Sequence, residues 1–247
     1  MSEPGARPAP RGSQQAAVPE GLVSAVVNLV GTGPVLLGAY TVAELTAVDA
    51  VVDFLQARPS DEVLAEAVRS LAARQLLVPG LGDQVQVRGD LGIAVAFEQR
   101  AQMVLDARVT GTGPGEPWRV LLLPQTEKIC LQYRIDALGI HEIGLYQLDQ
   151  ALDFLAGWLP GGPLADPDRA ADADSLLASA ERSALITITR YTTQGSAEIA
   201  GASSDLVLAR CDGRLHVLTR DPPDQARLIP APVDGQDIRD TLAALLA

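Results

Sequence analysis

Two glycine-rich loops are the parts of this sequence that come nearest to a phosphate-binding motif. The first, Gly-Thr-Gly-Pro at 31–34, follows an apolar run, as the loop of a dinucleotide-binding unit does. The third glycine of that motif is missing, and Pro34 has no N–H to donate to a phosphate oxygen. The second, Gly-Thr-Gly-Pro-Gly at 111–115, is followed by no lysine, serine or threonine at P-loop spacing. We therefore expect no nucleotide or other cofactor.

Histidine and cysteine, the other side chains suited to catalysis or metal binding, are scarce. His141 and His216 are the only histidines, and Cys130 and Cys211 are the only cysteines. No His-x-x-His or Cys-x-x-Cys spacing occurs, so the sequence gives no support for a zinc site. A Cys–His nucleophile pair is conceivable, but no catalytic motif flanks either cysteine. We expect reduced thiols, no bound metal and no enzymatic activity.

The charge balance argues against polyanionic partners. The chain has 19 Lys+Arg against 31 Asp+Glu, a net charge of −12, whereas nucleic acids and anionic membranes are bound by excess basic charge. Nine acids between Asp136 and Glu181 face only Arg169. Such a run is either solvated surface or an electrostatic rim for a partner with basic residues.

The N-terminal sequence predicts a tail rather than a targeting signal. Residues 1–20 are rich in Pro, Gly and Ala, which is typical of disorder. The apolar run 22–37 is broken by Asn28 and by the Gly-Thr-Gly-Pro loop, and periodicity does not decide between helix and strand. No stretch approaches the roughly 20 apolar residues of a membrane-spanning helix. We expect a cytoplasmic protein without membrane insertion.

A helical hairpin and a short wing are predicted next. Thr41 and Glu44 have the spacing of a capping box, and apolar residues then recur at helical spacing over 45–55 until Pro59. Ser60 can cap a second helix, which is followed over 77–88 by an alternating segment typical of a small β-hairpin.

The rest of the chain predicts two similar halves. Residues 100–110 superimpose on 182–192 with two arginines and a threonine in register, and 120–123 on 206–209. Each half ends in a predicted helix. The first half begins with a helix capped by Asp90, and its further predicted elements are strands at 103–109, 118–123, 129–135 and 144–148 and a helix at 149–159.

These elements predict an α+β fold in one domain, residues 21–247. Its halves, about 90–160 and 181–247, form a pseudo-two-fold repeat of antiparallel sheet plus helix, preceded by the helical hairpin and wing. A linker at 161–180, a loop with a short helix, joins them. Neither half is long enough to bury its apolar sheet face alone, so pairing into one larger sheet is expected.

A helical hairpin followed by a wing is also typical of winged-helix transcriptional regulators. The alternative functions are therefore such a regulator or another protein-binding module. The presumptive recognition helix, 60–74, carries three acids against two arginines. That surface would repel phosphates, which favours a contact with protein over a contact with DNA.

The order of elements resembles the EspG family of proteins associated with type VII (ESX) secretion. The resemblance rests on 45–55, on the Leu-Ala-Glu-Ala-Val-Arg-Ser-Leu segment of 64–78 leading to the wing, on 90–109 and on the two strand-rich halves. It implies a non-enzymatic cytosolic chaperone that binds helical secretion substrates of the PE/PPE type and keeps them soluble for export. The second half lacks the longer helical insert of the family, which leaves the client's identity open.

The resemblance also implies a client-binding surface at the loop between the first two strands of the sheet. Mapped onto this chain, that loop is 110–118. Trp118, next to it, is either an interface anchor or a core aromatic residue. The candidate partner-binding residues are Thr112, Gly113, Pro114, Glu116, Trp118, Leu121 and Leu123.

Overall fold

The computed structural model describes residues 20–50, 58–80, 85–166, 173–194, 197–220, 227–231 and 237–246. The helices are α1 (Glu20–Val30), α2 (Val42–Ala47), α3 (Asp61–Ala73), α4 (Gly89–Glu98), α5 (Leu148–Trp158), α6 (Ala173–Ser179) and α7 (Ile238–Leu246). The strands are β1 (Val35–Thr41), β2 (Leu77–Pro79), β3 (Val85–Val87), β4 (Met103–Val109), β5 (Arg119–Pro124), β6 (Ile129–Ile135), β7 (Ile140–Gln147), β8 (Arg182–Gln194), β9 (Ala197–Cys211), β10 (Arg214–Arg220) and β11 (Leu228–Pro230).

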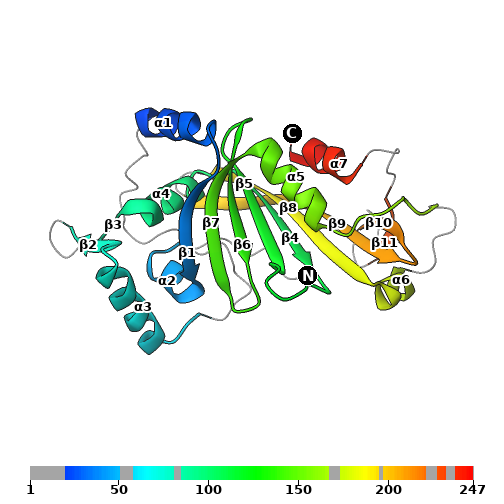
Figure 1. The fold of residues 1–247 in the computed structure, drawn as a ribbon, viewed down its shortest axis with the longest axis horizontal. Helices are drawn as coiled ribbons and strands as arrows, with labels where there is room; N and C mark the ends of the chain where they lie inside the picture. The colour runs from blue at the N-terminus through cyan, green and yellow to red at the C-terminus, as the bar shows by residue number, and fades with distance from the viewer. Residues whose placement is uncertain are drawn as a thin grey trace.

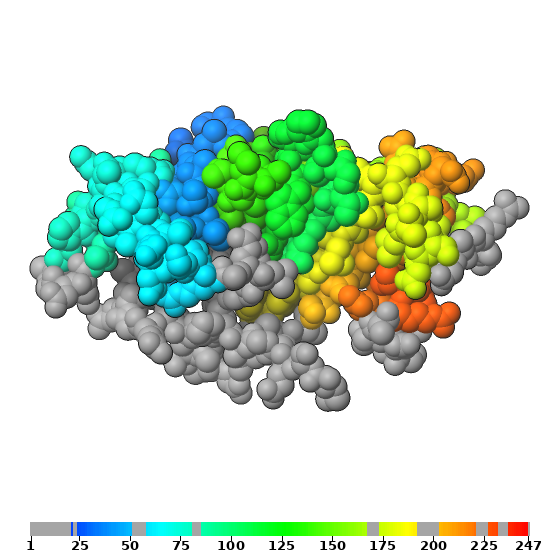
Figure 2. All heavy atoms as spheres, turned by 90° about the horizontal axis from the view of Figure 1, so that it is seen from below, coloured from blue at the N-terminus to red at the C-terminus, as the bar shows by residue number. Residues whose placement is uncertain are grey.

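One nine-stranded antiparallel sheet runs the length of the molecule (Figure 1). Its strand order is β1-β7-β6-β5-β4-β8-β9-β10-β11, so strands 4 to 7 and 8 to 11 run outward in opposite directions from the central β4–β8 pair. Seen from below, α3 lies near one end of the long axis and the C-terminal strands lie toward the other, with the N-terminal segment between α3 and the central strands (Figure 2). The fold is α+β, as expected from the sequence.

Two apolar layers cover the sheet. On one face, α5 and α7 pack over a cluster that we call the α5 core: its members include Leu105, Leu122, Cys130, Leu152, Leu155, Ile186, Leu208 and Leu242. On the other face of the first half lies the α4 core, which includes Leu37, Leu45, Leu71, Phe97, Leu121, Leu123, Leu131, Tyr133 and Leu145. Because strands β5 and β6 are covered on both faces, they are buried at nearly every position rather than alternately.

The apolar run at 22–37 forms both a helix and a strand. α1 ends at Val30, the Gly-Thr-Gly-Pro segment makes the turn, and β1 begins at Val35 and pairs with β7 at the sheet edge. The expected tail, residues 1–20, lies outside the described residues except for Glu20, where α1 begins.

The predicted capping box is confirmed, but the helix that follows is shorter than expected. The backbone N–H of Glu44 donates to Thr41 Oγ1, and the Thr41 N–H donates to Glu44 Oε2 at 3.0 Å. α2 ends at Ala47, and the chain turns at Asp49, whose φ is +54°. The prediction of one helix continuing through 45–55 is therefore wrong at Val48 and Asp49, and its residues 51–55 lie outside the described ones.

The second helix and the wing occur as predicted. Ser60 accepts a hydrogen bond from the Val63 N–H and caps α3, and β2 pairs with β3 in antiparallel register. Asp90 does not cap α4. The N-cap is Arg88, two residues earlier, and Asp90 lies inside the first turn of the helix, where a carboxylate is favourable for the helix dipole.

The residue-by-residue alignment of the two halves disagrees with the burial of their side chains. It sets Leu105 over Thr187, yet Leu105 is buried in the α5 core and Thr187 donates a hydrogen bond to Asp205. Ile186 and Ile188 share the α5 core with Leu105. A correspondence of Leu105 with Ile186 therefore matches the burial, since a slip of one residue moves every side chain to the other face.

Candidate protein-binding site

Of the residues considered for catalysis, Cys130, Cys211 and His141 are buried and His216 is half-buried. Cys130 belongs to the α5 core, and burial raises the pKa of its thiol to about 12. His141 pairs with Ile135, a residue of the α4 core, and directly opposite residues point to the same face of a sheet. Cys130 and His141 therefore lie on opposite faces. Within the part of the chain that the structure describes, no three His, Cys, Asp or Glu side chains gather so as to hold a metal ion.

The loop at 110–118 is compact and internally bonded. Gly111 and Gly115 adopt φ values of +70° and +80°, which a side chain would strain. The Gly113 N–H donates to Glu116 Oε2 at 2.8 Å, and the Glu116 N–H donates back to the Gly113 carbonyl. These two hydrogen bonds close the loop around the carboxylate of Glu116.

Arg182 of the second half and Trp158 at the end of α5 together hold this loop in place. The Arg182 guanidinium, at the start of β8, reaches Glu116 Oε1 at 3.2 Å and the Trp158 carbonyl at 2.9 Å. The Trp158 indole N–H donates to the Pro117 carbonyl at 3.1 Å. The hydrogen bond from Arg182, followed by that from the Gly113 backbone, lowers the pKa of Glu116 below its ordinary value. The loop is therefore a preorganised surface.

The turn at 136–139, between β6 and β7, lies beside this loop. The Trp118 indole N–H donates to the Asp136 carbonyl at 2.9 Å and so joins the two. Asp136 Oδ1 accepts the N–H groups of Leu138 and Ile140, both at 2.9 Å, which fixes the turn. Leu138 at its tip is 86% exposed. We call the loop and this turn together the hairpin end.

The structure divides the predicted site residues into two groups. Thr112, Gly113, Pro114 and Glu116 form the loop, and Trp118 is half-buried against the α4 core while bonding the neighbouring turn. Leu121 and Leu123 lie fully inside the α4 core. The expectation that these two leucines present apolar surface to a partner is corrected, because helices cover that face of β5.

Leu138 was not predicted from the sequence. Ile140 lies two positions away and Ile135 three, so apolar spacing does not set Leu138 apart, and the Asp-Ala-Leu-Gly turn composition was the available signal. Other large apolar side chains that are exposed are Leu29, Leu36, Val63, Val68 and Val85, on α1, β1, α3 and β3. None of these elements carries the hairpin end.

The arginines of α3 are engaged within the molecule. Arg69 pairs with Glu66 on the same helix at 2.8 Å. Arg74 pairs with the buried Glu44 at 2.9 Å and stacks over Tyr40 with its guanidinium carbon 5.1 Å from the ring centre. These contacts leave α3 with a predominantly acidic surface.

Comparison with known proteins gives no identification. No protein-family model matches the sequence, and no curated protein matches it with significance. The ranges described here contain no helix with the length and apolar character needed to cross a bilayer.

Proposed function

We propose that this protein is a non-enzymatic chaperone or adaptor of EspG type, which binds helical type VII secretion substrates of PE/PPE-like type in the cytoplasm and keeps them soluble for export. The observation that carries the proposal is Leu138, a largely exposed leucine on a rigid turn beside Trp118. A large apolar side chain held in water by a fixed turn is available for contact with a partner.

The hairpin end has the properties of a docking surface for a helix. Leu138 offers an apolar anchor, and Trp118 a partly covered aromatic edge. Thr112 and Glu116 supply a polar rim around them. Because Arg182 and Trp158 already fix the loop, a partner would lose little free energy in ordering it. The apolar stripe of an amphipathic helix fits this combination.

The net charge of −12 favours particular clients. Polar flanks that are basic or neutral would meet the acidic chain without repulsion. We expect added salt to slow association with such clients, because salt screens long-range steering.

Binding of a purified PE/PPE-type heterodimer, measured by calorimetry, tests this function. Leu138→Asp should weaken binding by about 2 kcal/mol or more, roughly 30-fold, as expected for loss of a central apolar anchor. Leu36→Asp is the matched control, because Leu36 is also exposed, at 63%, but lies on the edge strand β1. Equal binding by the Leu138 variant and the native chain would refute the site, and absence of binding by the native chain would refute the client class.

An acidic winged-helix regulator is the second candidate, since the β2–β3 pair follows α3 as a wing does. The engaged arginines of α3 count against it. A mobility shift on DNA at low salt, lost steeply as salt is raised, would favour the regulator over the chaperone.

A further inference from the structure

The C-terminal helix α7 fills an apolar groove beside α5. Leu242 is fully buried in the α5 core, and Ile238, Leu245 and Leu246 pack against the same cluster. Strands β8, β9 and β10 contribute Ile188, Leu206 and Val217 to that cluster. Apolar contact with the sheet and with α5 therefore holds α7 in place.

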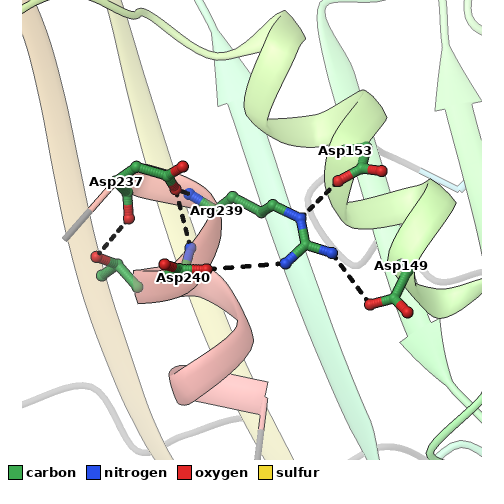
Figure 3. Close-up of polar contacts among 6 residues, drawn as sticks. Asp149, Asp153, Asp237, Arg239 and Asp240 are labelled. Atoms are coloured by element: carbon green, nitrogen blue, oxygen red, sulfur yellow. Dashed lines mark hydrogen bonds and ion pairs between the residues drawn. The ribbon is translucent and has the colours of Figure 1, made fainter.

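The polar attachments of α7 are at the surface. Arg239, in its first turn, crosses to α5 and places Nε 2.5 Å from Asp153 Oδ1 and Nη2 3.1 Å from Asp149 Oδ1 (Figure 3). The two aspartate side chains are 63% and 83% exposed. At the other end of the helix, Arg190 donates to the Leu245 carbonyl at 3.1 Å. Exposed ion pairs of this kind contribute little to stability and are screened by salt.

The shorter ion pairs of Arg239 cross from α7 to α5, whereas its contact with Asp240 of its own helix is longer, at 3.8 Å. A cation in the first turn of α7 opposes the helix dipole. Asp149 and Asp153, four residues apart on α5, repel each other unless a cation lies between them. Docking relieves both penalties at once. A nine-residue helix is also too short to persist in water without its groove.

We infer that this groove is an exchangeable helix-binding site. An amphipathic helix of another protein that carries arginine in its first turn and leucine three residues later, the spacing of Arg239 and Leu242, can displace α7. Asp149 and Asp153 select the arginine by charge, and the α5 core accepts the leucine. This site goes beyond the proposed function, because it requires neither the hairpin end nor a particular secretion client.

The test uses the full chain and a fluorescent synthetic peptide with the sequence of residues 237–247. Arg239→Glu weakens the tethered α7 while leaving Asp149 and Asp153 in place, so this variant should bind the peptide about tenfold more tightly than the native chain. Arg69→Glu makes the same charge change on α3 and should show no gain. A peptide with glutamate at the arginine position should not bind. Equal affinities for the Arg239 and Arg69 variants, or binding that ignores the peptide's arginine, would overturn the inference.

Hydrogen exchange on the native chain provides a measurement that does not depend on a variant. The amides of α7 should exchange faster than those of α5, and the difference should widen as salt screens Arg239 from its aspartates. If α7 stays as protected as α5 at every salt concentration, the helix is a fixed part of the core and the inference fails.

Discussion

Glu116 fixes the conformation of the loop in the hairpin end through hydrogen bonds to its side chain. It accepts from the Gly113 N–H and from Arg182, a residue 66 positions away, so it ties the loop both to itself and to the second half. No local pattern in the sequence relates positions 116 and 182. The position of the loop could be predicted from its glycines and prolines. Its contact with Arg182 could not, because only the β4–β8 pairing brings Arg182 close to the loop.

A pH titration checks this bond. The pKa of Glu116 is lowered chiefly by Arg182 and next by Gly113, from an ordinary value of 4.5. A carboxyl whose pKa falls on folding supports the loop above its unfolded value, and that support is lost as the pH drops through the lower, folded value. The NMR signal of the Gly113 amide should therefore shift with a midpoint below 4.5, and Glu116→Gln should abolish the shift. A midpoint at or above 4.5 would contradict the arrangement.

At the scale of helices and strands, Glu44 is a second connection that joins separate elements. Its carboxylate completes the cap of α2, accepts from Ser70 Oγ at 2.8 Å and pairs with Arg74, both near the end of α3. The side chain is almost fully buried. Removing it would leave polar groups of two helices without their partner.

We therefore expect Glu44→Ala to destabilise the fold by about 2–4 kcal/mol, the combined effect of a lost cap and lost charge-assisted hydrogen bonds in a buried place. Urea unfolding measures the change. Glu66→Ala is the matched control: its ion pair with Arg69 is exposed, so about 0.5 kcal/mol or less is expected. Similar losses for both variants would show that the Glu44 contacts do not connect α2 with α3.

Helices and strands that depend on residues close together in the sequence could be predicted. Features that depend on contacts between distant residues could not. The Thr41–Glu44 box and the Ser60 cap each join residues three positions apart. Strand β6 has the predicted bounds, 129–135, and five of its seven residues are apolar, with Gln132 and Arg134 between them. The end of α2 was missed, because apolar spacing continues past Asp49, where the backbone turns to pack Ala50 in the α4 core. Helical spacing shows that residues are buried, but not that the helix continues.

At the scale of the whole molecule, the seam between β4 and β8 organises the fold. Seven residue pairs, from Met103↔Arg190 to Val109↔Ala184, join the five strands on one side of the larger sheet to the four on the other. Thr110 and Ser183 extend the seam by exchanging hydrogen bonds. Each half also sends a helix, α5 or α7, to the same face (Figure 1). The repeat of one unit in the two halves stays a prediction, because the one-residue shift that matches their burial takes Arg100 and Arg108 out of register with Arg182 and Arg190.

Separated halves provide the test of that organisation. Fragments 20–166 and 173–247, produced together, should associate with about micromolar affinity or better, since each exposes one edge strand and half of the α5 core until they meet. The complex should have the circular dichroism spectrum of the intact chain. Fragments that fold separately as stable monomers would show that the seam is a contact between independent domains, and fragments that never associate would show that the chain folds only as one continuous unit. Association that requires the intact Arg182–Glu116 contact would further link the hairpin end to the seam, because that ion pair crosses from one fragment to the other.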